Sequence, residues 1–308
     1  MPSKSALLKI TVSLVLVIAL FFSIDRAALV ANFTLLNLKW VPLILFLVIL
    51  NYIISSFRWK QLLTIYKNSK GVSVGYLINL YFIGSFFNNF MPTSVGGDVY
   101  KIYKLGKKLG SKSDAFGATF MERFSGVAAL VFIAIFGFAT TFLGGIAGFE
   151  NNFYLLGLIV ISLVFGFALG SLVGLKTLRI LSGKFSKIDA VYTSLISYKG
   201  QGRVVLIAFL TSFVVQLVAI GTQYLIFVAL GTQLDIFRAL FIFPLITLAG
   251  FFVPSLNGIG VQDFLYKFSN SFLFVAAPTA VAASIFYHIA RLLVSLIGGV
   301  LYALGKAD

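Results

Sequence analysis

The chain has 308 residues, of which 60% are hydrophobic and only 11% are charged, and its formal net charge is +15. Soluble domains carry about 25% charged residues, so this composition excludes an ordinary soluble fold. The apolar residues form long runs, and a run of about 20 spans the hydrocarbon core as a helix. We therefore expect a polytopic protein of the cytoplasmic membrane. We expect it to be all-α, because the short alternating segments of a transmembrane barrel are absent from the sequence.

The residue inventory also limits the chemistry. The chain has no cysteine, which excludes disulfides and thiolate metal sites, and its single histidine, His288, argues against a histidine metal cluster. We expect no metal and no cofactor. An excess of cations could indicate a nucleic-acid partner, but in a membrane protein it first indicates cytoplasmic loops, so we expect no nucleic-acid binding.

Six apolar runs predict full transmembrane helices: 7–24, 41–57, 116–143, 153–175, 204–230 and 279–304. The first run is followed by Asp25 and Arg26 rather than by a small-residue cleavage site, so we interpret it as a retained span. Two further stretches, 71–112 and 238–277, are apolar but are interrupted by Pro, Gly, Asn and Asp.

The distribution of cations predicts the topology. Most of them lie before the first span, after the second, in the run from Lys101 to Lys112, between 176 and 203, and at Lys306. The positive-inside rule places these segments and both termini in the cytoplasm. Each broken stretch must then enter and leave on one side, as a re-entrant helical hairpin. Residues 1–148 and 149–308 would be two halves of one membrane domain, related as an inverted-topology repeat.

The two breaks share a composition of proline, small hydroxyl residues, glycines and an acid. Proline and glycine unwind helices, and unwound backbone at membrane depth is tolerated only where it lines protein or a watery cavity. We expect the two tips to meet near the midplane, where helix N-termini suit a phosphate. The candidate ligand-binding residues are Asn89, Ser94, Gly96, Gly97 and Asp98 in the first hairpin, and Ser255, Asn257, Gly258, Gly260 and Asp263 in the second. The two acids either cap the outgoing helices or bind ligand.

Arginines inside the spans that follow the hairpins are further candidates. Arg123 and Arg291 lie deep in their helices, which costs several kcal/mol unless they are paired or hydrated. We expect both to bind a lipid phosphate through forked guanidinium bonds. The alternative is a structural ion pair: Arg123 with Asp98 or Glu122, and Arg291 with Asp263.

Two neighbouring ionisable residues have open roles. Glu122 points about 100° away from Arg123 on the helix, and either reaches the interface or titrates. His288 lies one turn before Arg291 and either carries protons or forms a hydrogen bond between helices.

Two other segments have simpler readings. The basic stretch 176–203 predicts an amphipathic helix on the cytoplasmic leaflet, which either binds anionic headgroups or only sets the topology. Gly166, Gly170 and Gly174 repeat every four residues, as in a helix-packing face.

Taken together, these motifs resemble the lysylphosphatidylglycerol synthase transmembrane-domain family of flippase-like proteins. The resemblance rests on four short segments and covers essentially the whole chain: Asn88 to Lys101 with its Gly-Gly-Asp, Glu122 to Gly126, Pro254 to Asp263, and Arg58-Trp59. At Asp263 the family usually has Glu. Arg58 joins the candidate binding residues on this basis.

The resemblance implies movement of charged lipids between leaflets, so we expect a flippase or scramblase for a phosphate-bearing polar or aminoacylated lipid. Some family members are fused to a soluble aminoacyltransferase, which we expect this chain, ending at Asp308, to lack; a separate lipid-modifying enzyme would then supply its cargo. Membrane phospholipids with anionic headgroups are the expected partners, and a homo-oligomer is possible. The alternatives are a secondary transporter of a small soluble anion and a membrane-embedded lipid-modifying transferase, although no tight pair of acids favours an enzyme. No ATP-binding motif is present in the sequence, so active transport would need an ion gradient.

Overall fold

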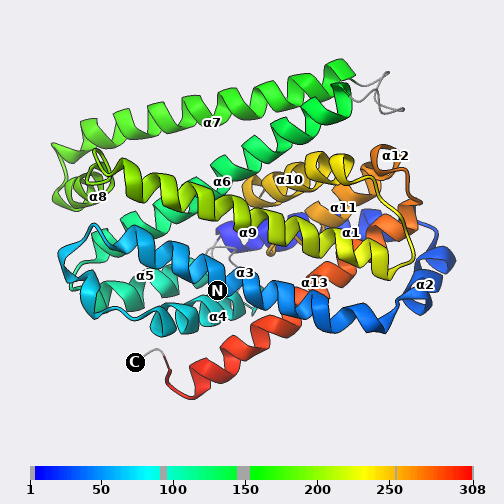
Figure 1. Cartoon of the computed structure of the whole chain (residues 1–308), viewed down its shortest axis with the longest axis horizontal. Helices are drawn as coiled ribbons and strands as arrows, with labels where there is room; N and C mark the ends of the chain where they lie inside the picture. Colours follow the sequence, from blue (N-terminus) through cyan, green and yellow to red (C-terminus); the bar gives the residue numbers. More distant parts are fainter. Residues whose placement is uncertain (1–3, 91–95, 144–152, 254, 307–308) are drawn as a thin grey trace.

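The computed structural model describes residues 4–90, 96–143, 153–253 and 255–306. Within these ranges the chain is helical and forms no β-strand; Leu256 and Ile259 form one isolated bridge. The long helices run along or obliquely to the long axis of the molecule (Figure 1). The predicted all-α class is therefore confirmed.

Four helical segments of the described residues are long and apolar enough to cross a membrane: Leu38–Leu63, which contains η1 (Leu38–Trp40) and α3 (Val41–Leu63), then α6 (Lys112–Leu143), α9 (Gly202–Ala229) and α13 (Ala277–Ala303). Helices α1 (Lys4–Ser23) and α2 (Arg26–Leu35) bend by 96° and give a fifth candidate only if the pair forms one span. The bend follows from Asp25, whose carboxylate caps α2 by accepting a 3.0 Å bond from the Ala28 N–H. The 30-residue α7 (Phe153–Ser182) covers the expected span 153–175. The count of six spans and the cytoplasmic termini stay predictions.

The first broken stretch is a helical hairpin. After η2 (Lys67–Gly71), helix α4 (Val74–Phe90) packs on α5 (Gly96–Leu109). At the tip, the Gly97 N–H donates to Asn88 Oδ1 at 2.9 Å, and at the base the Lys108 ammonium lies 4.8 Å from the Tyr76 ring. These contacts pair residues in opposite order along the chain, so the two helices are antiparallel. A Cβ at Gly97 would clash with the Gly84 backbone, and only glycine permits this approach.

The second broken stretch folds back in a similar way, but its outgoing helix is shorter. Helix α10 (Ile236–Phe252) packs on α11 (Val261–Phe268), which leads into α12 (Asn270–Leu273). The turn between them has positive φ at Asn257 (50°), Gly258 (90°) and Gly260 (81°). Such backbone favours glycine, which explains the glycines of this break. The position of both hairpins relative to a bilayer stays a prediction.

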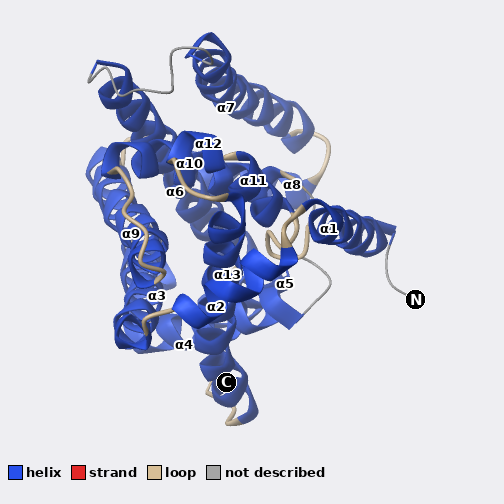
Figure 2. Ribbon diagram, turned by 90° about the vertical axis from the view of Figure 1, so that its right-hand side faces the viewer, coloured by secondary structure: helices blue, strands red, loops and turns tan. Residues whose placement is uncertain are grey.

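The two halves of the chain interlock through their last long helices. Helix α3 packs along α9, while α13 packs on α4 and α6 packs on α10 (Figures 1 and 2). Close approach is possible because Gly298 of α13 lies against the Phe82 backbone and Gly137 of α6 lies against the Leu240 and Phe241 backbone. The last long helix of each half thus crosses the hairpin of the other half.

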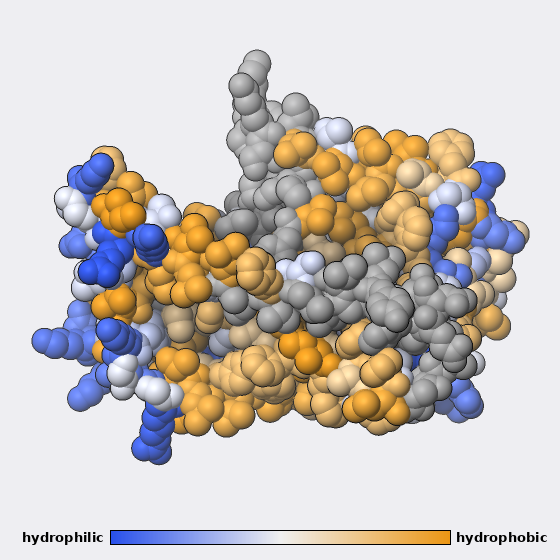
Figure 3. Space-filling model, turned by 90° about the horizontal axis from the view of Figure 1, so that it is seen from above, coloured by the Kyte–Doolittle hydropathy of each residue, from blue (hydrophilic) through white to orange (hydrophobic). Residues whose placement is uncertain are grey.

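The surface is apolar around the middle of the molecule and hydrophilic at its two ends (Figure 3). Helix α8 (Ser186–Ile196) lies at one end, where Tyr66 Oη is 2.9 Å from Ser194 Oγ and Tyr198 Oη donates to the Leu62 carbonyl at 2.9 Å. The predicted helix in 176–203 is therefore held against the end of α3. Nothing lies within 4 Å of a Cβ built at Gly166, Gly170 or Gly174, so no described element packs on this predicted packing face.

Candidate functional site

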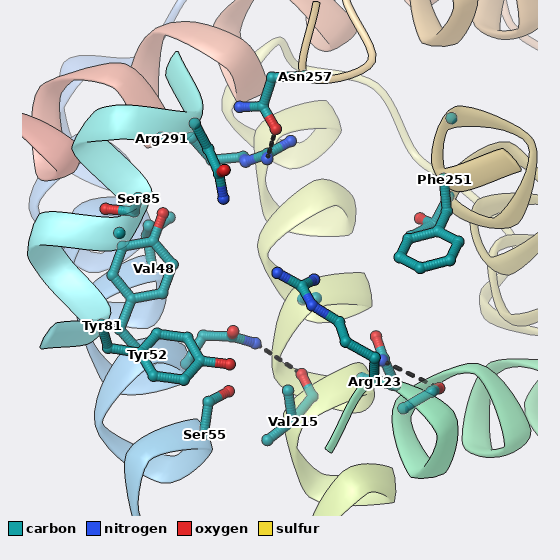
Figure 4. Close-up of a pocket in the computed structure, with 18 of the residues that line it drawn as sticks. Val48, Tyr52, Ser55, Tyr81, Ser85, Arg123, Val215, Phe251, Asn257 and Arg291 are labelled. Atoms are coloured by element: carbon teal, nitrogen blue, oxygen red, sulfur yellow. Dashed lines mark hydrogen bonds between the residues drawn. The ribbon is translucent and has the colours of Figure 1, made fainter. Parts of the chain in front are cut away.

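A cavity of about 540 Å³ lies between the two hairpins and helices α3, α6, α9 and α13 (Figure 4). One part of its wall is apolar and includes Val48, Val127, Leu130, Val215 and Phe251. The rest of the wall carries charged side chains and amides: Asn51, Arg58, Asn88, Asn89, Asp98, Lys101, Glu122, Arg123, Gln216, Asn257, Gln262 and Arg291.

Glu122 and Arg58 form a buried ion pair at the edge of this cavity. Glu122 is 0% exposed and Arg58 5%, and their Oε1 and Nη2 atoms are 2.7 Å apart. Arg58 also donates to Ser212 Oγ at 2.9 Å, and the Tyr81 hydroxyl donates to Glu122. Glu122 therefore does not reach the interface, which was one of its two predicted roles. The expected second span, 41–57, was too short: α3 continues to Leu63, which brings Arg58 inside the protein rather than into a cytoplasmic loop.

Lys101, which was predicted to lie in a cytoplasmic segment, is instead a residue of the site. It is 2% exposed, and its ammonium lies 3.0 Å from Asp98 Oδ1 and 3.9 Å from Glu122 Oε2. The same ammonium faces the rings of Tyr81 at 4.3 Å and Trp59 at 5.0 Å. The signal for this role was the i, i+3 spacing of Asp98 and Lys101, which puts both on one face of a helix.

Arg123 pairs with Asp98, as the structural alternative predicted. Its Nη2 lies 2.8 Å from the Asp98 carboxylate, which is thereby shared between Arg123 and Lys101. The Arg123 side chain is nevertheless 39% exposed, although its Nε is buried and has no hydrogen-bond partner. This guanidinium can therefore bind a further anion while it stays paired with Asp98.

Arg291 reaches the same cavity from α13, opposite Arg123 (Figure 4). Its Nη2 donates to Asn257 Oδ1 at 3.0 Å, and its guanidinium lies 5.4 Å from the Tyr287 ring centroid. Within the described residues, no carboxylate lies within ion-pair distance of it. The alternative pair of Arg291 with Asp263 is therefore wrong.

The hairpin tips meet through two asparagines. Asn257 Nδ2 donates to Asn89 Oδ1, which joins the turn between α10 and α11 to the end of α4. Ser94, also expected at this junction, lies outside the described residues. Five further predicted tip residues, besides Asp263, are absent from the cavity wall: Gly96, Gly97, Ser255, Gly258 and Gly260. They shape the hairpins instead.

Asp263 caps helix α11, which is one of its two predicted roles. Its Oδ2 accepts from the Gly260 N–H at 2.8 Å, and its Oδ1 accepts from the Ser284 hydroxyl at 2.6 Å. His288 Nε2 lies 3.4 Å from the same Oδ1. Neither Asp263 nor His288 belongs to the cavity wall.

The charges that line the cavity do not cancel. Four cations (Arg58, Lys101, Arg123 and Arg291) face two carboxylates (Asp98 and Glu122), which leaves an excess of two positive charges. Both carboxylates are already engaged in ion pairs. The cavity therefore suits an anionic group such as a phosphate, which guanidinium groups bind through forked bonds. Among the described residues, no group of three or more His, Asp or Glu side chains could hold a metal ion.

An apolar surface around a helical bundle, with a cation-rich cavity inside, defines a multi-pass membrane protein. The family described as the lysylphosphatidylglycerol synthase TM region matches residues 6–299, and the chain belongs to this family. No curated protein and no solved structure matches the chain.

Proposed function

We propose that this protein translocates a phosphate-bearing lipid between the leaflets of the cytoplasmic membrane. The observation that carries the proposal is the pair of arginines that face one cavity from α6 and α13. One of them is only partly neutralised and the other has no carboxylate partner among the described residues. A guanidinium without an anion inside a membrane is costly, and a lipid phosphate would relieve that cost.

The cavity has a path by which a headgroup could enter from the side. Arg123 is 39% exposed and Phe251, also in the wall, is 51% exposed. Phe116 and Phe120 precede Arg123 on α6, and their side chains are 37% and 43% exposed. A polar headgroup could occupy the cavity while its acyl chains stay among these apolar side chains, as lipid transport requires.

Translocation also requires access from both leaflets, and an inverted repeat with two re-entrant hairpins would supply it. Two pairs of contacts support such a repeat. Asp98 and Arg123, 25 residues apart, correspond to Asp263 and His288, also 25 apart. This spacing matches Arg123 with His288, and not with Arg291, the other arginine that follows a hairpin.

The second pair of contacts concerns the long helices α3 and α9. Gln223 and Tyr266 form a hydrogen bond across 43 residues, the same separation as between Arg58 and Lys101, which both contact Glu122. The reciprocal packing of α13 on α4 and α6 on α10 agrees with the same two-fold relation. The first half has charged groups where the second half has mainly neutral ones.

We propose transport rather than catalysis because the acids of the cavity are not free to exchange protons with a substrate. Asp98 is paired with Arg123 and Lys101, and Glu122 with Arg58. General acid–base chemistry needs an acid or base within hydrogen-bond reach of the reacting group.

The test is translocation of a fluorescent phosphatidylglycerol in liposomes that contain the purified protein. A membrane-impermeant reductant bleaches only the outer leaflet, so loss of fluorescence beyond that fraction measures transfer. We expect transfer by the wild type, and strong loss in Arg123→Ala and in Arg291→Ala. Arg26→Ala is the matched control, since this exposed arginine stacks on Phe21 away from the cavity.

Two results would contradict the proposal. One is wild-type transfer no faster than in protein-free liposomes. The other is wild-type transfer rates in both cavity variants. Transfer of a soluble phosphate ester without transfer of lipid would instead assign the cavity to a solute transporter.

A further inference from the structure

We propose that Asp263 and His288 form a proton-binding site that couples the cavity to the proton gradient across the membrane. The inference rests on the proposed lipid translocation, and supplies the energy source that the sequence leaves open. The event is the gain or loss of one proton on the His288 imidazole, with no other bond formed or broken.

The two groups lie at ion-pair distance without a hydrogen bond between them. His288 Nε2 lies 3.4 Å from Asp263 Oδ1. The side chains are 14% and 6% exposed, so the pair is nearly closed to water. The Gly260 N–H and the Ser284 hydroxyl hold the carboxylate at 2.8 and 2.6 Å whatever the state of the imidazole. Protonation of His288 would add an ion pair to this fixed carboxylate.

The corresponding pair in the first half indicates what the protonated state resembles. Asp98 and Arg123 have the same 25-residue separation and connect the outgoing hairpin helix to the next long helix. An arginine keeps its charge at every accessible pH, whereas a histidine changes charge near neutral pH. One half therefore carries a permanent ion pair, and the other carries one that depends on proton concentration.

Among the residues that the structure describes, Asp263 is the one acid within ion-pair distance of His288. On its own helix the neighbouring ionisable residues are Tyr287, whose ring centroid is 6.5 Å away, and Arg291, which is bound to Asn257. Charged residues of the other elements packed on α13 and α11 contact other groups: Arg238 of α10 lies over the Phe274 ring, Arg58 pairs with Glu122, Lys60 donates to the Ser69 and Val72 carbonyls, Lys267 donates to the Ser23 carbonyl, and Arg26 lies over Phe21. The tyrosines of these elements also have other partners: Tyr266 bonds to Gln223, Tyr81 to Glu122 and Tyr224 to the Leu234 carbonyl, while Tyr76 faces Lys108 and Tyr52 packs on Tyr81 and Phe82.

The pair is connected to the cavity through the second hairpin. Asp263 caps α11 at Gly260, and the turn that ends at Gly260 carries Asn257, the hydrogen-bond partner of Arg291. His288 and Arg291 lie one turn apart on α13. A stronger ionic contact between His288 and Asp263 would therefore fix the turn that positions Asn257 against Arg291. A weaker contact would let this turn move.

The first experiment observes proton binding directly and needs no transport. His288 is the only histidine of the chain, so isotope-labelled histidine gives a single imidazole NMR signal when a histidine-free affinity tag is used. We expect this signal to change with pH, because protonation alters the imidazole ring. We also expect the midpoint to move when phosphatidylglycerol is added, because coupling between two sites is reciprocal. A signal that does not titrate, or a midpoint unaffected by saturating lipid, would overturn the proposal.

The second experiment measures lipid transfer in liposomes with and without an imposed pH gradient. We expect the wild-type rate to change about fivefold or more with the gradient. His288→Arg, which copies the permanent pair of the first half, and His288→Gln, which carries no charge, should both transfer lipid without responding to the gradient. A gradient response in both variants equal to that of the wild type would refute the coupling.

The two failures can be distinguished. If no lipid is transferred under any condition, the proposed function is wrong. The NMR titration still decides whether His288 binds a proton and whether lipid binding changes that midpoint. If lipid is transferred at a rate independent of the gradient, the proposed function stands and the coupling does not.

Discussion

Removal of the charge of Glu122 should strongly destabilise the protein. Glu122 is 0% exposed and accepts from Arg58 at 2.7 Å, with Lys101 at 3.9 Å. The surrounding cluster has three cations (Arg58, Lys101 and Arg123) and two carboxylates. Glu122→Gln leaves three cations against Asp98 alone. Breaking one partner of a buried pair costs about 3–5 kcal/mol, because the other charge stays buried without compensation.

The second half of the prediction is that removal of both partners is tolerated. In the double variant Arg58→Met, Glu122→Gln, the remaining cations are Lys101 and Arg123, and the cluster has the same net charge as in the wild type. Removal of both charges of a buried pair leaves no uncompensated charge, and replacement of such pairs by well-packed apolar side chains is often neutral or stabilising. Met fills the place of Arg58 with an apolar side chain, and Gln keeps the shape of Glu122 and can still accept from the Tyr81 hydroxyl. We therefore expect the double variant to be more stable than Glu122→Gln alone, which is a coupling that a double-mutant cycle measures.

Thermal unfolding in detergent, followed by tryptophan fluorescence, checks both expectations. Trp59 is a suitable probe because its ring lies 5.0 Å from the Lys101 ammonium, and the chain has only one other tryptophan. Asp189→Asn is the control, since this acid is exposed on α8 and surface charges contribute little. The reasoning is refuted if Glu122→Gln unfolds at the wild-type midpoint, or if the double variant is less stable than the single one.

Two further changes test the hairpin tip and the interlocked helices. Asn257→Gly should keep stability within about 1 kcal/mol of the wild type, because glycine suits the φ of 50° at this position and so offsets the lost hydrogen bonds. Added phosphatidylglycerol should still raise the unfolding midpoint of Asn257→Gly, whereas it should not raise that of Arg291→Ala. Equal loss of this lipid effect in both variants would contradict the role given to Arg291. Gly298→Ala should destabilise the protein by about 1–3 kcal/mol, because the added Cβ would overlap the Phe82 backbone. Gly75→Ala is the control: no atom lies within 4 Å of a Cβ at this position, so this variant should unfold at or slightly above the wild-type midpoint. Equal midpoints for the two variants would show that α13 and α4 do not pack this closely.

The sequence predicted the helix breaks and helix starts well, because proline, glycine and N-terminal acids have specific effects on helix ends. Proline and glycine marked both hairpin breaks, and the acids after them marked the starts of the outgoing helices. Two of the predicted ionic contacts depended on partner choice, and the sequence could not decide it. Arg123 pairs with Asp98, as one alternative held, but Asp263 contacts His288 rather than Arg291. Helix phase alone puts His288 and Arg291 on nearly the same face, so only the approach of α11 selects between them.

The sequence by itself determined the helical membrane class, the two breaks and the family, because long apolar runs, helix-breaking residues and short motifs are local properties of the chain. The tertiary structure decided which charges meet. Lys101 and Arg58 read as loop cations in the sequence, yet both are buried, because α5 folds back on α4 and α3 extends past its apolar run to Leu63. Charge pairing acts over a few ångströms between residues tens of positions apart, and so it follows from the packing of helices rather than from their order.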